Sequence, residues 1–143
     1  MNLAPRKICR GSTVVEVGLS PGNVVRVSGV FRETGEEPWL QDLLVSIHEE
    51  AQRIRLDELL LDLRDLTYAN AEGWRNLVLL LRLLKGPPRA SYKLLMLTNM
   101  AHQWQRVGIP TLSVFGGSML NIESSSTSQE PDLADAGRRS WKA

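Results

Sequence analysis

The sequence has few of the side chains that build metal or redox sites. Its 143 residues include one cysteine, Cys9, and two histidines, His48 and His102. A single cysteine cannot form an internal disulfide, so the fold needs no oxidising compartment. The two histidines belong to separate predicted helices and have no cysteine or histidine at ligand spacing, which argues against a metal site. We therefore expect neither a metal nor another cofactor.

Long apolar runs and a dominant charge are missing as well. The longest apolar run, residues 77–81, ends at Arg82 and is far too short to span a bilayer. The N-terminus MNLAPRKICRGS lacks the apolar segment of a secretory signal. The formal net charge is +1, so no global field favours nucleic acid or acidic lipid. These absences predict a cytoplasmic protein without direct membrane insertion and without a nucleic-acid partner.

Two segments rich in β-branched residues follow the N-terminus. Residues 13–19 read TVVEVGL and residues 24–31 read VVRVSGVF, and both patterns are typical of strands. The turn residues SPGN lie between them, so we expect an N-terminal β-hairpin. Residues 1–12 are expected to be a loose leader. The strand at 13–19 is expected to lie at an exposed sheet edge, where two copies could pair into a homodimer.

Helical and strand patterns alternate through the rest of the domain. Pro38 opens a run of apolar residues at helical spacing, and residues 58–63, ELLLDL, read as a strand buried on both faces. Residues 71–85 predict a second helix, which Gly86-Pro87-Pro88 closes. We further expect a strand at 92–97, a short helix at 100–107 that Gly108 stops, a strand at 111–115 and a helical turn near 118–122.

The order of these elements predicts the fold class and the domain boundaries. We expect one α/β domain over residues 13–122, with a mixed sheet that joins the hairpin to parallel central strands and packed helices. From residue 123 onward the sequence is polar and serine-rich. Such a segment buries too little apolar surface to offset the entropy of ordering, so a flexible tail is expected over 123–143.

The start of the helix at 71–85 carries the most functional information. The loop at 64–70 leaves the carboxyl end of a predicted parallel strand, where α/β folds tend to place their working residues. Asn70 is a favourable N-cap, and Glu72 adds negative charge where the helix end is partly positive. Asp62, at the end of the strand, is expected to bond backbone amides.

The stretch ELLLDLRDLTYANAEGWRNLVLLLRLLKG resembles the central segment of STAS domains, a family named after sulfate transporters and anti-sigma-factor antagonists. VVRVSGVF resembles the family's second strand, YKLLMLTN its fourth, and QRVGIPTLSVF its final helix–strand passage. The resemblance covers residues from about 13 to 120 and implies a STAS-like fold. In the family's anti-sigma-factor antagonists, a serine at the helix start is phosphorylated by a partner serine kinase, and the unmodified form binds that kinase.

This sequence departs from the family pattern at the decisive position. Asn70 stands where the family has aspartate, Ala71 stands where it has serine, and Gly73 is kept. Alanine has no hydroxyl, so Ala71 cannot be phosphorylated. The phosphorylation switch is absent, has moved to Thr67 or Tyr68, or is replaced by another input. Asn70 can still cap the helix, but Ala71 lacks the hydroxyl that would accept a phosphate. This combination indicates a docking site held in its unmodified form.

The resemblance implies a non-enzymatic regulatory module in a partner-switching circuit. Its expected partner is an anti-sigma-type serine kinase or a similar signalling protein. Leu79 and Leu83 lie on the helix side away from the predicted core stripe and would add a small apolar patch. The residues expected to bind the partner are Thr67, Tyr68, Asn70, Ala71, Glu72, Trp74, Arg75, Leu79 and Leu83.

Two other functions stay open. STAS-like modules also serve as cytoplasmic accessory subunits of membrane transporters, for example of a lipid-type ABC system, and this role needs no phosphoserine. The third alternative is a small-ligand carrier or an enzyme. Asp62 and Asp65 could be a carboxylate pair, but no nucleophile or general-acid partner accompanies them in the sequence.

Overall fold

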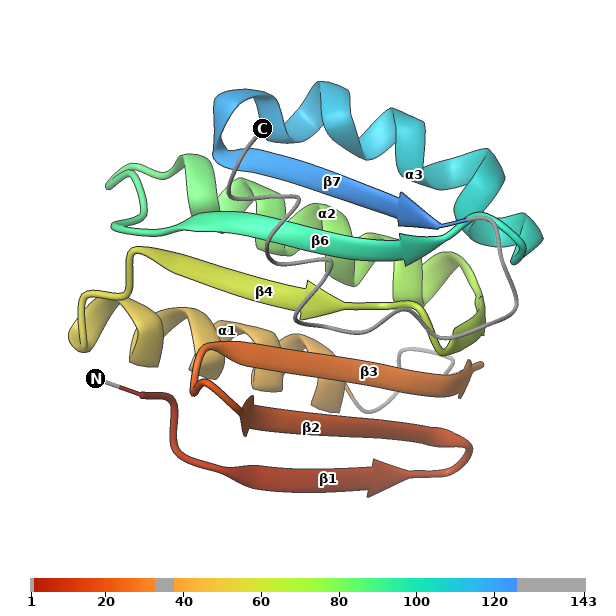
Figure 1. Ribbon diagram of the computed structural model, residues 1–143, viewed down its shortest axis with the longest axis horizontal. Helices are drawn as coiled ribbons and strands as arrows, with labels where there is room; N and C mark the ends of the chain where they lie inside the picture. The colour runs from red at the N-terminus through yellow and green to blue at the C-terminus, as the bar shows by residue number, and fades with distance from the viewer. Residues whose placement is uncertain (1, 33–37, 126–143) are drawn as a thin grey trace.

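The structure, a computed structural model, describes residues 2–32 and 38–125. These residues form a mixed seven-stranded sheet and three α-helices (Figure 1), so the expected α/β class is confirmed. The strands are β1 (Arg6–Arg10), β2 (Thr13–Leu19), β3 (Val24–Phe31), β4 (Glu58–Asp62), β5 (Leu66–Ala69), β6 (Lys93–Asn99) and β7 (Leu120–Ser125). The helices are α1 (Trp39–Arg53), α2 (Ala71–Lys85) and α3 (Gln103–Gly116), and a 3-10 turn, η1 (Gly117–Met119), follows α3.

The sheet joins an antiparallel part to a parallel part. β1, β2 and β3 are antiparallel neighbours, which includes the expected hairpin β2–β3. β4, β6 and β7 then follow β3 in parallel, in the order β1-β2-β3-β4-β6-β7. β5 also pairs with β3 in parallel, farther along that strand than β4 does. β4 and β5 therefore share one neighbour and are separated by a bend.

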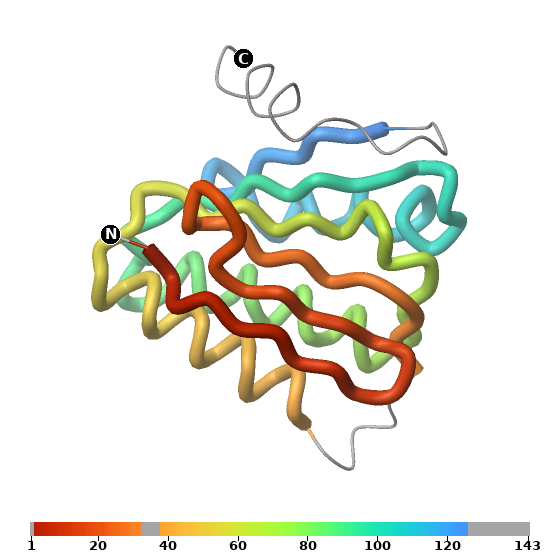
Figure 2. The backbone as a smooth tube through the Cα atoms, turned by 60° about the horizontal axis from the view of Figure 1, so that its bottom comes forward, coloured from red at the N-terminus to blue at the C-terminus, as the bar shows by residue number. Residues whose placement is uncertain are grey.

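The three α-helices lie on one face of the sheet. The parallel strands are added in a single direction, with one helix in each connection between β3, β4, β6 and β7. Right-handed crossovers that advance in one direction place every helix on the same face. Figures 1 and 2 show α1, α2 and α3 side by side against that face. As a result, the starts of α2 and α3 lie at the same end of the sheet, beyond the carboxyl ends of β5 and β6.

The main core lies between the helices and the sheet. The predicted stripe of α2 is buried, as expected, and consists of Gly73, Leu77, Leu80, Leu81 and Leu84. In β4 the inward residues Leu59 and Leu61 join this core, while Leu60 belongs to a smaller apolar cluster on the opposite face. Successive side chains of a strand point to opposite faces, so the continuous apolar run of β4 reflects burial on both sides.

The expectation of a loose leader over residues 1–12 is wrong for residues 6–10. These residues form β1, which pairs with β2 along its length. Leu3 is fully buried, and the backbone N–H of Ala4 donates to the Glu50 carboxylate at 2.7 Å. β1 reads RKICR, which has no apolar alternation, so only its pairing with β2 makes it a strand. The β2 edge, expected to be free for a second copy, is thus occupied by β1.

The C-terminal elements also differ from expectation. The helix expected to stop at Gly108 continues to Gly116, so residues 111–115 are helical, and the whole segment QRVGIPTLSVF lies within α3. Gly108 leaves room for the indole of Trp74, which packs on it. A Cβ at this position would lie 2.6 Å from Trp74 Cζ3. Pro110 lies inside α3, where its missing N–H removes one intrahelical hydrogen bond.

The last strand, β7, begins directly after η1 and extends the folded part beyond the expected boundary at residue 122. It runs to Ser125 and pairs with β6 along its length. The helical turn expected near 118–122 is therefore η1 followed by strand. The remainder of the expected flexible tail, residues 126–143, lies outside the described residues.

Candidate functional site

A bend after β4 opens the sheet where α2 begins. The backbone N–H of Leu63 still donates to the carbonyl of Leu97 in β6 at 2.8 Å. The chain then turns away from β6, and β5 pairs with β3 instead. The loop expected at 64–70 therefore contains a four-residue strand, Leu66–Ala69. The carbonyl groups of Leu63, Arg64 and Leu66 accept hydrogen bonds from side chains at the start of α3, whereas the Asp65 carbonyl accepts the backbone N–H of Gly29 in β3.

Gln105 is the central link between α3 and this bend. Its Nε2 donates to the carbonyl oxygens of Leu63 and Leu66 at 2.6 and 3.1 Å. Its Oε1 accepts the backbone N–H of Asn99 at 2.7 Å. Gln105 is fully buried, and these three bonds satisfy its amide in the core, so it joins α3, β6 and the bend in one network.

Two further side chains at the start of α3 bond the same bend. Trp104 Nε1 donates to the Leu66 carbonyl at 2.8 Å, and His102 Nε2 donates to the Arg64 carbonyl at 2.9 Å. A carbonyl oxygen only accepts, so the Nε2 of His102 carries the proton. Together with Gln105, these contacts hold the first turn of α3 beside β5 and the start of α2.

Asp62 and Arg64 form a buried ion pair at the end of β4. Asp62 accepts the backbone N–H of Arg64 at 3.1 Å, its Nε at 2.9 Å and its Nη2 at 3.0 Å, and accepts Arg26 Nε at 3.3 Å. Burial alone raises the pKa of Asp62, but the hydrogen bonds and charge of Arg64, with the bond from Arg26, outweigh it and hold that pKa below its usual value. The expectation that Asp62 bonds a backbone amide is confirmed.

The first turn of α2 has the predicted cap. Asn70 Oδ1 accepts the backbone N–H of Gly73 at 3.1 Å. A Cβ on Gly73 would lie 2.9 Å from Phe31 Cδ1 and 3.0 Å from Ala69 Cβ, so glycine allows the helix start to approach β3 and β5 closely. Ala71 is the first helical residue, and it is exposed.

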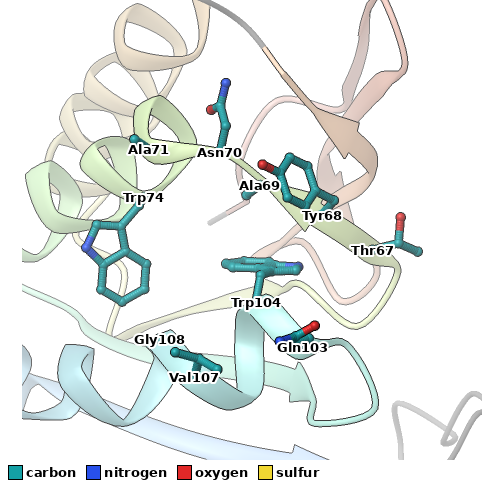
Figure 3. A pocket seen from close by; sticks show the side chains of 10 residues that line it. All are labelled: Thr67, Tyr68, Ala69, Asn70, Ala71, Trp74, Gln103, Trp104, Val107 and Gly108. Carbon is teal, nitrogen blue, oxygen red and sulfur yellow. The ribbon is translucent and has the colours of Figure 1, made fainter.

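A pocket of about 650 Å³ lies between the starts of α2 and α3 and the end of β5 (Figure 3). Trp74 from α2 and Trp104 from α3 flank it, and Tyr68 stands on the β5 side. Five of the residues predicted for partner binding line it, namely Thr67, Tyr68, Asn70, Ala71 and Trp74. The structure therefore brings the central part of the predicted site together around one opening.

The other half of the lining was missed by sequence reasoning: Ala69, Gln103, Trp104, Val107 and Gly108. Four of these residues come from α3, whose packing against α2 is a long-range contact. Trp104 carried a usable signal, because an aromatic side chain on a short helix next to a predicted working edge is a candidate for a pocket wall. Because the helix was expected to end at Gly108, the sequence did not show that Trp104 belongs to the longer helix α3.

The remaining predicted residues, Glu72, Arg75, Leu79 and Leu83, do not line the pocket. Glu72 and Arg75 form an ion pair with each other on the surface of α2. Leu79 and Leu83 are half-buried, so the apolar patch expected from them is not an exposed one.

The alternative acceptor Thr67 is exposed, and its hydroxyl donates to the Gly29 carbonyl at 3.1 Å. Tyr68 is 44% exposed, with the Arg32 guanidinium 5.7 Å from the centre of its ring.

The residues considered for metal or thiol chemistry are dispersed. His48 Nδ1 lies 2.6 Å from the Tyr92 hydroxyl in the core, far along the chain from the His102 contact with Arg64. Cys9 is exposed on β1. In residues 2–32 and 38–125, no three His, Cys, Asp or Glu side chains form a group that could hold a metal ion.

Within the same described ranges, no helix combines the length and the apolar character needed to cross a bilayer. A scan of protein-family models, a search of curated proteins and a search of solved structures each found no match to this chain.

Proposed function

We propose that this chain is a non-enzymatic regulatory protein-binding module with a STAS-like, anti-sigma-factor-antagonist-like role in the cytoplasm. One observation carries the proposal: the capped start of α2 presents an exposed Ala71 at the rim of an aromatic pocket. Trp and Tyr side chains around a concave surface are typical of protein-binding hot spots. The partner is an anti-sigma-type serine kinase or a related signalling protein that binds this rim.

The chemistry of Ala71 defines what kind of switch operates. A phosphate at this position would add about two negative charges beside the pocket. Alanine cannot accept one, so the docking surface keeps a single state unless Thr67 or Tyr68 takes the phosphate. The exposure of both hydroxyl-bearing residues supports that alternative input. A phosphopeptide map of protein isolated from its own cells distinguishes a fixed surface from a displaced switch.

The test is a comparison of two charge substitutions. Ala71→Asp places a carboxylate at the pocket rim and is expected to weaken partner binding at least tenfold. Gln41→Asp places the same charge on an exposed position in the first turn of α1, away from the pocket, and should leave binding unchanged. The partner is identified by affinity purification with the wild-type chain and titrated against all three proteins. Equal affinities for wild type and Ala71→Asp would disprove docking at this rim.

A transporter accessory role is the second candidate, and the same residue favours it. Docking to a transporter domain needs no phosphoacceptor, so an exposed alanine at the helix start is compatible with it. Purification of a membrane-associated ATPase with the wild-type chain, in place of a soluble kinase, would select this candidate. The small-ligand carrier is the third, because a pocket of about 650 Å³ lies in the size range of ligand sites. Native mass spectrometry of the purified protein tests it.

A further inference from the structure

The described residues have four exposed large apolar side chains, and three of them belong to α3. They are Tyr68, Val107, Val114 and Phe115, with exposed fractions of 44%, 70%, 79% and 41%. Tyr68 and Val107 line the pocket, and Val114 and Phe115 lie about two turns farther along α3. Val107 and Val114 are seven residues apart, so they occupy the same side of the helix at a separation of about 10 Å. The apolar surface of the pocket therefore continues along α3.

The composition of α3 is unusual for a helix with this much exposure. Its sequence, QWQRVGIPTLSVFG, contains a single charged residue, Arg106. The exposed side of a surface helix normally carries charged and polar residues. Apolar exposure combined with depletion of charge is the composition found in the centre of protein–protein interfaces. At Val107, Val114 and Phe115, α3 thus has the character of a contact surface that extends beyond the start of α2.

The charges at the border of this surface are positive. Arg32 lies over the Tyr68 ring at one end, and the exposed Arg106 lies on α3, where it donates to the Met100 carbonyl at 3.2 Å. No acidic side chain of the described residues lies on α3 or lines the pocket. The nearby Glu72 is neutralised by its ion pair with Arg75. A complementary partner would therefore carry an apolar centre with carboxylates at its border.

We infer that α3 and the pocket bind an acidic amphipathic helix of a partner protein. Because the backbone of α3 is internally hydrogen-bonded, recognition must occur through side chains, as in binding modes that lay a helix against a groove. An aromatic or large apolar anchor enters the pocket between Trp74 and Trp104. The anchor contacts Val107 at the pocket, a residue two turns away contacts Val114, and carboxylates face Arg32 and Arg106. This inference rests on the proposed function as a protein-binding module and adds the chemistry of the partner.

The test uses a displayed random-peptide library of about 20 residues selected on the wild-type protein. The expected consensus has apolar residues at i, i+3 or i+4, and i+7, one of them aromatic, with Asp or Glu at the border. A synthetic consensus peptide should lose at least tenfold in affinity to Val114→Lys and to Trp74→Ala. Ser113→Lys puts the same charge on another exposed side of α3 and should change affinity by less than threefold. Circular dichroism melting curves confirm that each variant is folded.

Several results would overturn the inference. These are failure to enrich peptides, a basic consensus, a consensus without helical spacing, or a consensus peptide whose affinity is unaffected by Val114→Lys. Sedimentation of wild type as a dimer that Val114→Lys dissociates would assign the surface to a second copy of this chain. The proposed function is judged separately: a natural partner that is lost with Ala71→Asp but retained with Val114→Lys would preserve the docking rim and refute the role of α3.

Discussion

At the residue scale, the hydrogen bonds of the site fall into two kinds. Asn70 caps α2 from three residues away, and Asp62 accepts the backbone N–H of Arg64 two residues on. Such contacts follow from local geometry and were predictable from residue type and position. Gln105 and Trp104 reach carbonyls of Leu63 and Leu66 that are 38 to 42 residues away in sequence. No local pattern encodes such a contact, so the contacts of Gln105 and Trp104 were found only in the structure.

The Asp62–Arg64 pair predicts a specific loss of stability. Asp62→Asn keeps the shape but leaves Arg64 with a buried charge and a weakened partner, which should cost about 3 kcal/mol at pH 7. Because the folded state lowers the pKa of Asp62, its contribution is fully present above the unfolded value of 3.8 and is lost as the pH falls through the lower folded value. Urea unfolding at pH 7 and pH 3 measures both effects. Parallel curves at the two pH values for wild type and variant would contradict this assignment.

His48 predicts a second pH effect, at higher pH. Burial lowers the pKa of His48 and the charge of Glu49 opposes that shift only in part, so the folded protein binds the proton less readily than the unfolded chain. The stabilisation is complete above the usual value of 6.5 and decreases as the pH falls from there toward the folded pKa. Denaturant titrations between pH 5 and 7.5 should show this slope. His48→Gln, which retains hydrogen-bonding capacity toward Tyr92 but cannot titrate, should flatten it, and an unchanged slope would exclude His48.

At the element scale, the bounds of a helix could be predicted from the sequence when nearby residues mark both of its ends. The cap at Asn70 and the Gly-Pro-Pro segment mark both ends of α2, and its predicted bounds, residues 71–85, match the structure. α3 contains two residues that usually end helices, Gly108 and Pro110, yet it continues to Gly116. Gly108 is needed there because of Trp74, a residue of another helix. The sequence alone does not distinguish a glycine that permits close packing from a glycine that ends a helix.

The glycine at the start of α2 yields a test of this packing. Helix propensity alone predicts that Gly73→Ala stabilises the protein by about 1 kcal/mol. The added Cβ would lie 3.0 Å from Ala69 Cβ, which is bonded directly to the backbone and cannot rotate away, and 2.9 Å from Phe31. Overpacking of this kind costs about 1 to 3 kcal/mol, so we expect no gain and a net loss of about 1 kcal/mol. Thermal unfolding measures it, with Thr111→Ala at an exposed position of α3 as control. A rise in Tm for Gly73→Ala would show that the helix start can move.

Gln105, which bonds α3 to the bend, provides a second test at this scale. Gln105→Leu keeps a side chain of similar size but removes the donor for the Leu63 and Leu66 carbonyls and the acceptor for the Asn99 N–H. Leaving these buried groups without partners should cost about 2 to 4 kcal/mol. The pocket wall at Trp104 should also become more mobile, because Trp104 bonds the Leu66 carbonyl of the same bend. Hydrogen exchange of the amide of Asn99 and quenching of tryptophan fluorescence by acrylamide report the two effects. Retained protection at Asn99 would show that another group replaces Gln105.

At the scale of the whole molecule, the mixed sheet explains how the site is built. Addition of β4, β6 and β7 in one direction places the three α-helices of the described residues on one face, and this aligns the starts of α2 and α3. The step of β5 from β6 toward β3 then creates the space between them. The alternation of strands and helices in the sequence was sufficient to predict the α/β class. It did not reveal β1 or β5, because short strands without apolar alternation depend on their neighbours.

The N-terminal strand carries the last prediction, which concerns the stability and the association state of the molecule. A chain that begins at Ser12 loses β1, the fully buried Leu3 and two partners of the buried Glu50, namely the Ala4 N–H and Arg6 at 3.0 Å. Loss of a buried leucine alone costs about 2 to 5 kcal/mol, so the urea midpoint should fall strongly. The exposed edge of β2 should then pair with a second copy, which sedimentation would detect. Lys7→Ser, at an exposed position of β1, should leave both properties unchanged. A stable monomer beginning at Ser12 would instead mean that the sheet is complete without β1.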